Sequence, residues 1–95
     1  MKIVTWNCNG ALRRKYAFLA NFDADILIIQ ECEDPAQSDV EHYRKWAANY
    51  LWTGDNKNKG LGIFCKQDIV IERNNWNVND SKYFLSVRVN RFLIF

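Results

Sequence analysis

Residues 24–31 of this 95-residue chain are ADILIIQE, and this stretch decides the fold class. Its centre, Ile26 to Ile29, is a continuous apolar run, whereas a strand with one face in water alternates apolar and polar residues. A continuous run is typical of a strand that is covered on both faces. We therefore predict a central strand over residues 26–29, with Gln30 and Glu31 following at its carboxyl end.

The segments before this strand predict a β-α-β unit. Residues 2–6 are mostly β-branched or aromatic, and Asn9-Gly10 is a turn signal directly after them. Over residues 11–22 the apolar side chains recur at helical spacing, at Leu12, Tyr16, Leu19 and Phe22. A strand, a helix and a strand within about 30 residues predict two parallel strands joined by a right-handed crossover.

The opposite side of this first helix carries three consecutive cations, Arg13, Arg14 and Lys15. We expect a solvated helix face there, and contact with a phosphate backbone is the alternative interpretation.

The second helix has two compatible starts and is expected to run to about residue 49. Ser38, with Glu41 three positions later, matches a capping box. Asp34 followed by Pro35 is an equally good start, since proline is favoured at the first helical position.

The second half of the chain predicts antiparallel strands. Residues 51–53 and 61–65 flank a polar turn over residues 54–60, which indicates a hairpin. Residues 68–72 are a further strand candidate, and residues 81–89 alternate apolar and polar side chains as a half-buried strand does. The predicted fold class is therefore α/β, with a mixed β-sheet and flanking helices.

Composition limits what the chain can be. A chain of 95 residues makes at most one domain with a modest core. A content of 48% hydrophobic and 15% aromatic residues argues against disorder. The net charge of +2 is too small to indicate a nucleic-acid partner by itself.

The three cysteines, Cys8, Cys32 and Cys65, are odd in number and widely spaced, and no signal-peptide pattern precedes them. We therefore predict a cytoplasmic protein. A disulfide between Cys8 and Cys32, or a zinc site that includes His42, is a weaker alternative to buried free thiols. No stretch approaches the roughly 18–20 continuous apolar residues of a membrane span, so we predict no membrane partner.

Polar side chains follow both parallel strands at their carboxyl ends, where ligands bind in open α/β sheets. These are Asn7 and Asn9 after the first strand and Glu31 after the second. One carboxylate with neutral carbonyl oxygens suits Mg²⁺ or Mn²⁺. The alternative is that the asparagines only shape a turn and that Glu31 lies on a solvated loop.

Three stretches resemble the endonuclease/exonuclease/phosphatase superfamily, which includes deoxyribonuclease-I-like enzymes. MKIVTWNCNGAL (residues 1–12) resembles its opening strand motif, and ADILIIQE (residues 24–31) resembles the strand that ends in its metal-binding glutamate. WTGDNKNKGLGIFCK (residues 52–66) is similar to the glycine-containing hairpin that follows.

The resemblance implies a divalent-metal-dependent phosphoester hydrolase, a nuclease or phosphatase, whose fold is a four-layer α/β sandwich. It implies that Glu31 and Asn7 are catalytic residues of the metal site: Glu31 ligates Mg²⁺ or Mn²⁺ directly, and Asn7 orients the metal shell and the phosphate. Asn9 is then a substrate-binding residue. The implied partner is a phosphoester substrate, with nucleic acid as one class.

Later family motifs, an Asp-x-Asn after Gly and a closing Asp-His pair, have no counterpart in this sequence. We therefore expect residues 1–95 to form one partial domain, the N-terminal half of such a sandwich, which is inactive alone. Residues 91–95, RFLIF, begin a strongly apolar strand at the end of the chain, which indicates self-association through an exposed sheet or this strand. A non-catalytic interaction domain and a nucleotide-binding module are the alternative functions.

Overall fold

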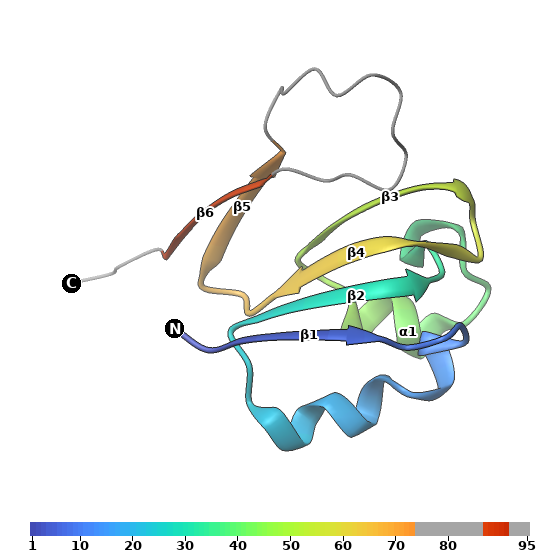
Figure 1. Cartoon of the computed structure of the whole chain (residues 1–95), viewed down its shortest axis with the longest axis horizontal. Coiled ribbons are helices and arrows are strands. Elements are labelled where there is room, and N and C mark those ends of the chain that lie inside the picture. The colour runs from blue at the N-terminus through green and yellow to red at the C-terminus, as the bar shows by residue number, and fades with distance from the viewer. Residues whose placement is uncertain (74–86, 92–95) are drawn as a thin grey trace.

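The computed structural model describes residues 1–73 and 87–91, and Figure 1 shows the arrangement of their helices and strands. Four strands form the main sheet in the order β1-β2-β4-β3. Their bounds are Ile3–Asn7 for β1, Ile26–Cys32 for β2, Tyr50–Asn56 for β3 and Lys59–Cys65 for β4. Strands β1 and β2 are parallel, while β4 is antiparallel to both β2 and β3. The predicted mixed α/β sheet is confirmed.

The predicted parallel pair of strands is confirmed, but the α-helix predicted between them is wrong. Two 3₁₀ helices, η1 (Leu12–Arg14) and η2 (Tyr16–Phe22), replace the helix predicted over residues 11–22. Ala11 precedes them in the left-handed region with φ 55, and Lys15 interrupts them with φ −120. Backbone angles of this kind are incompatible with a continuous α-helix.

The prediction of which side chains of this crossover face the core is nevertheless correct. Leu12 and Leu19 are buried, and Tyr16 and Phe22 pack at the edge of the same cluster. The hydrophobic periodicity therefore predicted the buried face even though it mispredicted the helix type.

The second predicted helix is also divided, and neither proposed start describes it fully. Asp34 caps a short 3₁₀ helix, η3 (Pro35–Gln37), and α1 (Glu41–Trp46) follows. The Ser38 hydroxyl accepts from the Val40 backbone N–H at 3.1 Å and is not the N-cap of α1, so the capping box does not form. The helix ends at Trp46, before the predicted residue 49, because Ala47 leaves helical geometry with ψ 60.

The hairpin of β3 and β4 is confirmed, with a tighter turn than predicted. Only Lys57 and Asn58 lie between the strands, whereas the sequence predicted a turn over residues 54–60. The Asn56 side chain accepts from the Asn58 backbone N–H at 2.9 Å and closes this turn locally.

Two apolar clusters cover the two faces of the sheet. The larger lies on the side of the helices and includes Ile29, Phe64 and Tyr43. The smaller joins Ile26 and Ile63 to Ile69 of β5 (Ile69–Arg73). Residues 26–29 are thus covered on both faces, as the continuous apolar run predicted.

Strand β5 pairs with β6 (Val87–Arg91) in a separate two-stranded antiparallel sheet. This confirms the strand candidate at residues 68–72 within a residue and the candidate at residues 81–89 in part. Residues 81–86 and 92–95 lie outside the described residues. Self-association through an exposed sheet or the end of the chain stays a prediction. Within the described part of the chain, no helix is long and apolar enough to cross a membrane.

Candidate functional site

The candidate site lies at the edge where β1 and β2 end side by side (Figure 1). The register pairs Asn7 with Gln30, and two backbone hydrogen bonds extend this contact beyond the strands. Cys8 N–H donates to the Gln30 carbonyl at 3.2 Å, and Gly10 N–H donates to the Glu31 carbonyl at 3.0 Å. The turn after β1 is therefore attached to the segment that carries Glu31.

A β-bulge sets the direction of the Glu31 side chain. The pairing of β2 with β4 skips Glu31, whose φ is 56. Ile29 and Cys32, on either side of the bulge, are both fully buried in the cluster under the helices. Because the extra residue interrupts the alternation of faces, Glu31 leaves the core and its side chain is 39% exposed. The sequence alone gave no sign of this bulge.

Asn7 and Asn9 build the turn that adjoins Glu31. The Asn7 Oδ1 accepts from the Asn9 backbone N–H at 3.0 Å, which is an Asx turn. Asn9, Gly10 and Ala11 all have positive φ, of 57, 85 and 55. Asn7 thus shapes the turn with its side-chain carbonyl oxygen. Its side-chain N–H₂ group takes no part in this hydrogen bond.

Lysines supply cations that the sequence analysis did not assign to the site. The Lys59 ammonium lies 3.9 Å from Glu31 Oε1, and the Lys15 ammonium donates to the Cys8 carbonyl at 2.6 Å. Lys15 is therefore not part of a simply solvated face. Lys59 lies within the polar turn predicted over residues 54–60, and only the hairpin geometry brings it to Glu31.

The donor set fits a water-rich divalent-metal site with one carboxylate. Among residues 1–73 and 87–91, no three His, Cys, Asp or Glu side chains gather in an arrangement that would hold a metal ion. Mg²⁺ commonly takes only one or two carboxylates and fills its other positions with water and substrate phosphate. The partly exposed Glu31 carboxylate meets this requirement, with the oxygens of Asn7 and Gln30 at the same edge of the sheet.

The three cysteines and His42 are not part of this donor set. All three cysteines are free thiols, so the disulfide alternative is wrong. Burial raises the pKa of the Cys8 thiol and raises that of Cys32 to about 12, which disfavours the thiolate that zinc needs. His42 is exposed on α1, where its Nδ1 lies 2.8 Å from the Tyr16 hydroxyl.

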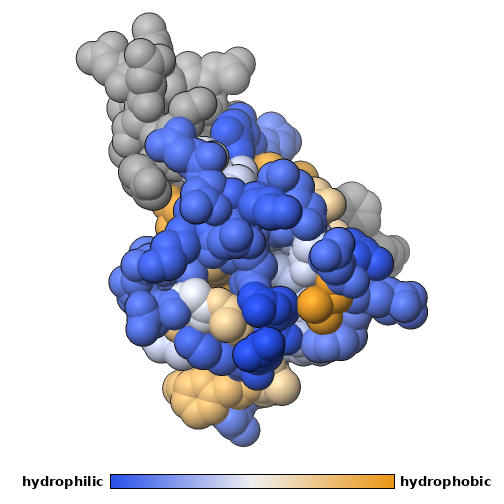
Figure 2. All heavy atoms as spheres, turned by 90° about the vertical axis from the view of Figure 1, so that its right-hand side faces the viewer, coloured by the Kyte–Doolittle hydropathy of each residue, from blue (hydrophilic) through white to orange (hydrophobic). Residues whose placement is uncertain are grey.

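A polar cavity of about 500 Å³ adjoins this edge. Its walls come from the turn after β1, from η1, from the segment after β2 and from the β3–β4 turn, with Arg13, Glu33 and Lys59 among the lining residues. Figure 2 looks onto this end of the molecule and shows a mainly hydrophilic surface.

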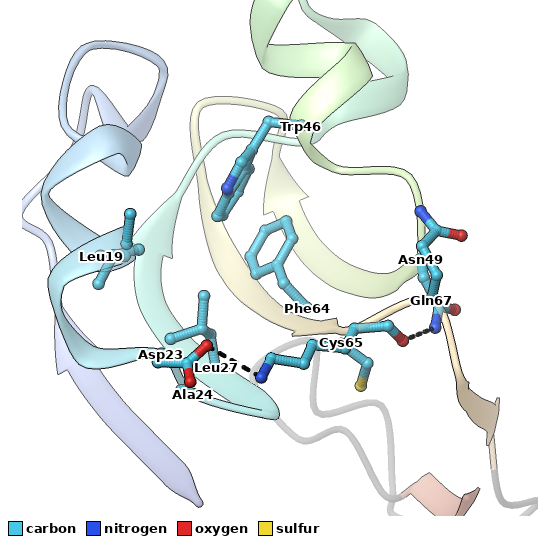
Figure 3. A pocket seen from close by; sticks show the side chains of 11 residues that line it. Leu19, Asp23, Ala24, Leu27, Trp46, Asn49, Phe64, Cys65 and Gln67 are labelled. Carbon is cyan, nitrogen blue, oxygen red and sulfur yellow. Dashed lines mark hydrogen bonds and ion pairs between the residues drawn. The ribbon is translucent and has the colours of Figure 1, made fainter. Parts of the chain in front are cut away.

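A second cavity of about 410 Å³ lies at the opposite end of the sheet. Figure 3 shows Trp46 and Phe64 side by side in its wall, with Leu27 below them and the Asp23 side chain in an ion pair at its rim. The aromatic ring centroids are 4.9 Å apart. These contacts extend the core, and no predicted site residue lines this cavity.

The comparisons with known proteins agree with this arrangement. Residues 4–94 match the model of the Endonuclease/Exonuclease/phosphatase family, so the chain belongs to that family. Neither a curated protein nor a solved structure matches the chain. Membership supports phosphoester hydrolysis in general, and this family generally depends on a divalent metal.

Proposed function

We propose that this chain carries the first part of the active site of a Mg²⁺- or Mn²⁺-dependent phosphoester hydrolase. The observation that supports this most is the attachment of the Asn7–Gly10 turn to the Glu31 bulge, by Cys8 N–H to Gln30 and Gly10 N–H to Glu31. These bonds attach the turn that carries the carboxamides to the segment that carries the carboxylate, at the carboxyl ends of two parallel strands, where α/β sheets bind ligands.

In this proposal Glu31 ligates the ion through its carboxylate, while Asn7 and Asn9 orient the phosphate. The Asn7 N–H₂ group would donate to a phosphate oxygen, since its Oδ1 already accepts from Asn9 N–H. A bound divalent ion would polarise the phosphoryl oxygen and stabilise the leaving oxygen. The carboxamides stabilise charge without adding a negative charge that would repel the phosphate.

Strand β5 connects the two-stranded sheet to the main sheet by packing. Ile69 of β5 packs against Ile26 and Ile63 of the main sheet. We propose that the β5–β6 pair begins the second sheet of a four-layer sandwich, of which residues 1–95 are a part. The free thiols are compatible with the cytoplasmic location that we propose.

Substitution of Glu31 tests the site. The Glu31→Gln variant keeps the shape of the side chain and removes its charge, so we expect loss of Mn²⁺ binding measured by the relaxation of water protons. The matched control is Glu41→Gln, because Glu41 is an exposed carboxylate that pairs with Lys45 on α1. Equal Mn²⁺ binding by Glu31→Gln and wild type would remove Glu31 from the metal site.

A further inference from the structure

We propose that Lys15 is a positioning residue, which fixes the turn of Asn7 and Asn9 in place beside Glu31. This inference rests on the proposed function, because in that function Asn7 orients the phosphate next to the metal ion. It goes beyond the proposed function, since Lys15 itself contacts neither the ion nor the phosphate and acts only through the backbone of the turn.

The turn after β1 has a backbone conformation that few residue types adopt. Asn9, Gly10 and Ala11 follow one another in the left-handed region, with φ values of 57, 85 and 55. Glycine enters this region without steric cost and asparagine is tolerated there, whereas the Cβ of alanine crowds a backbone carbonyl oxygen. Such residues persist only where surrounding contacts hold them, and they cluster at functional sites. Ala11 therefore requires contacts that restrain the turn.

Lys15 bonds to both ends of this left-handed run. Its ammonium donates to the carbonyl of Cys8, the residue before Asn9, at 2.6 Å. Its backbone N–H donates to the carbonyl of Leu12, the residue after Ala11, at 2.9 Å. Leu12 is fully buried, so this end of the run is fixed to the core. A single residue thus bridges the strained part of the turn.

The ammonium controls the orientation of one peptide plane. The Cys8 carbonyl and the Asn9 N–H belong to the same peptide unit, which is planar and rigid. Lys15 holds the carbonyl end of this plane at 2.6 Å, and the Asn7 Oδ1 accepts from the N–H end at 3.0 Å. A rotation of the plane would therefore pull the Asn7 side chain with it or break its hydrogen bond. The orientation of the Asn7 N–H₂ group thus depends on Lys15.

The other polar groups of Cys8 are engaged with β2 and do not replace Lys15. The Cys8 N–H donates to the Gln30 carbonyl at 3.2 Å, and the thiol donates to the Glu31 carbonyl at 3.3 Å. These bonds fix the start of the turn, but the Cys8–Asn9 peptide plane rotates about the backbone bond that follows. The hydrogen bond from Lys15 is charge-assisted, and such bonds are stronger than those between neutral groups.

Hydrogen exchange on the full chain tests whether Lys15 restrains the turn. The reporter is the Gly10 N–H, which donates to the Glu31 carbonyl at 3.0 Å. Loss of one charge-assisted hydrogen bond shifts an equilibrium by about tenfold or more, so we expect the Gly10 N–H to exchange about tenfold faster in Lys15→Met. Ile29 is fully buried in the central strand and should keep its wild-type exchange rate. A general loss of stability would accelerate Ile29 as well.

Broadening of NMR signals by Mn²⁺ tests whether this restraint positions Asn7. The ion broadens the signals of nearby protons, and the effect falls steeply with distance. The signal followed is the Asn7 side-chain N–H₂ group. The reference is the side-chain N–H₂ group of Gln30, which donates to Thr5 Oγ1 at 3.0 Å and lies outside the turn. We expect the excess broadening of Asn7 over Gln30 to be lost in Lys15→Met, while Mn²⁺ affinity does not fall, because removal of a cation cannot repel the ion.

Two further variants separate restraint of the turn from charge and from folding. Arg14→Met removes a cation from the exposed neighbouring position and should leave both measurements unchanged. Ala11→Gly removes the steric cost of a φ near 55, so it should restore slow Gly10 exchange and the Asn7 broadening in the Lys15→Met background. If Lys15→Met alone does not fold, we expect Ala11→Gly to restore folding, and an unfolded double variant would overturn the inference.

Four other results would contradict the role of Lys15. They are wild-type exchange of Gly10 in Lys15→Met, equal acceleration of Gly10 and Ile29, the same changes in Arg14→Met, and Asn7 broadening that survives in Lys15→Met. Failure of the proposed function gives a different result, because Asn7 would then show no excess broadening even in the wild-type chain. Gly10 exchange still measures the restraint by Lys15 in that case.

Discussion

In the proposed site, Lys59 and a divalent ion would compete for Glu31, so removal of the lysine charge should strengthen metal binding. The Lys59 ammonium lies 3.9 Å from Glu31 Oε1, with 61% of the lysine side chain and 39% of the glutamate side chain exposed. An unscreened Coulomb estimate at this separation would overstate the effect, because water screens both groups. Exposed ion pairs contribute about 0.2–1 kcal/mol.

We therefore expect Lys59→Gln to bind Mn²⁺ about 1.4- to 5-fold more tightly than wild type, as 1.4 kcal/mol corresponds to a factor of about ten. The gain should shrink as salt rises, because the Debye length falls to about 10 Å at 0.1 M. Water-proton relaxation at low and moderate salt measures both effects. The control is Lys45→Gln, whose ammonium pairs with Glu41 on α1 at 3.1 Å. Unchanged or weaker binding in Lys59→Gln, or an equal gain in the control, would refute this account of Glu31.

Three further predictions concern the scaffold. Gly60→Ala should destabilise the hairpin by about 1–3 kcal/mol in urea unfolding, because an added Cβ overlaps the Thr53 carbonyl oxygen, which the backbone cannot readily move; a stability equal to wild type would contradict this packing. Tyr43→Phe should lower the free energy of unfolding by about 1–3 kcal/mol, since it leaves the buried Glu33 carbonyl without the hydroxyl that donates to it; no change would mean that water replaces the donor. Stability should also fall with rising pH, because burial raises the pKa of Cys32 from 9.0 to about 12. The folded thiol stays protonated while the unfolded thiol ionises, so the contribution of the protonated thiol is complete below pH 9 and is lost between about pH 9 and 12, at up to about 1.4 kcal/mol per pH unit. Urea unfolding at pH 8 and pH 10.5 should show a smaller loss in Cys32→Ala than in wild type, and equal losses would argue against this thiol.

The local pattern of apolar residues was sufficient to predict the two parallel strands that carry the candidate site. The continuous apolar run at residues 26–29 predicted a doubly covered strand, and the β-α-β order placed Asn7 and Gln30 at one edge of the sheet. Periodicity also predicted the burial of Leu12 and Leu19. It failed for helix type and helix ends, because those depend on the backbone angles at Ala11 and Lys15 in the crossover and at Ala47 after α1, which the pattern of side chains does not specify.

The sequence by itself thus determined that β1 and β2 run parallel, that β3 and β4 form a hairpin, and at which edge the polar residues emerge, because these features follow from local apolar patterns and turn signals. Only the tertiary structure decided the direction of the polar side chains at this edge and which side chains lie next to them. The bulge turns Glu31 out of the core, the hairpin brings in Lys59, and Glu33 anchors Arg13 across 20 positions of sequence. Contacts between residues so far apart depend on how the elements pack in three dimensions, and no local spacing encodes them.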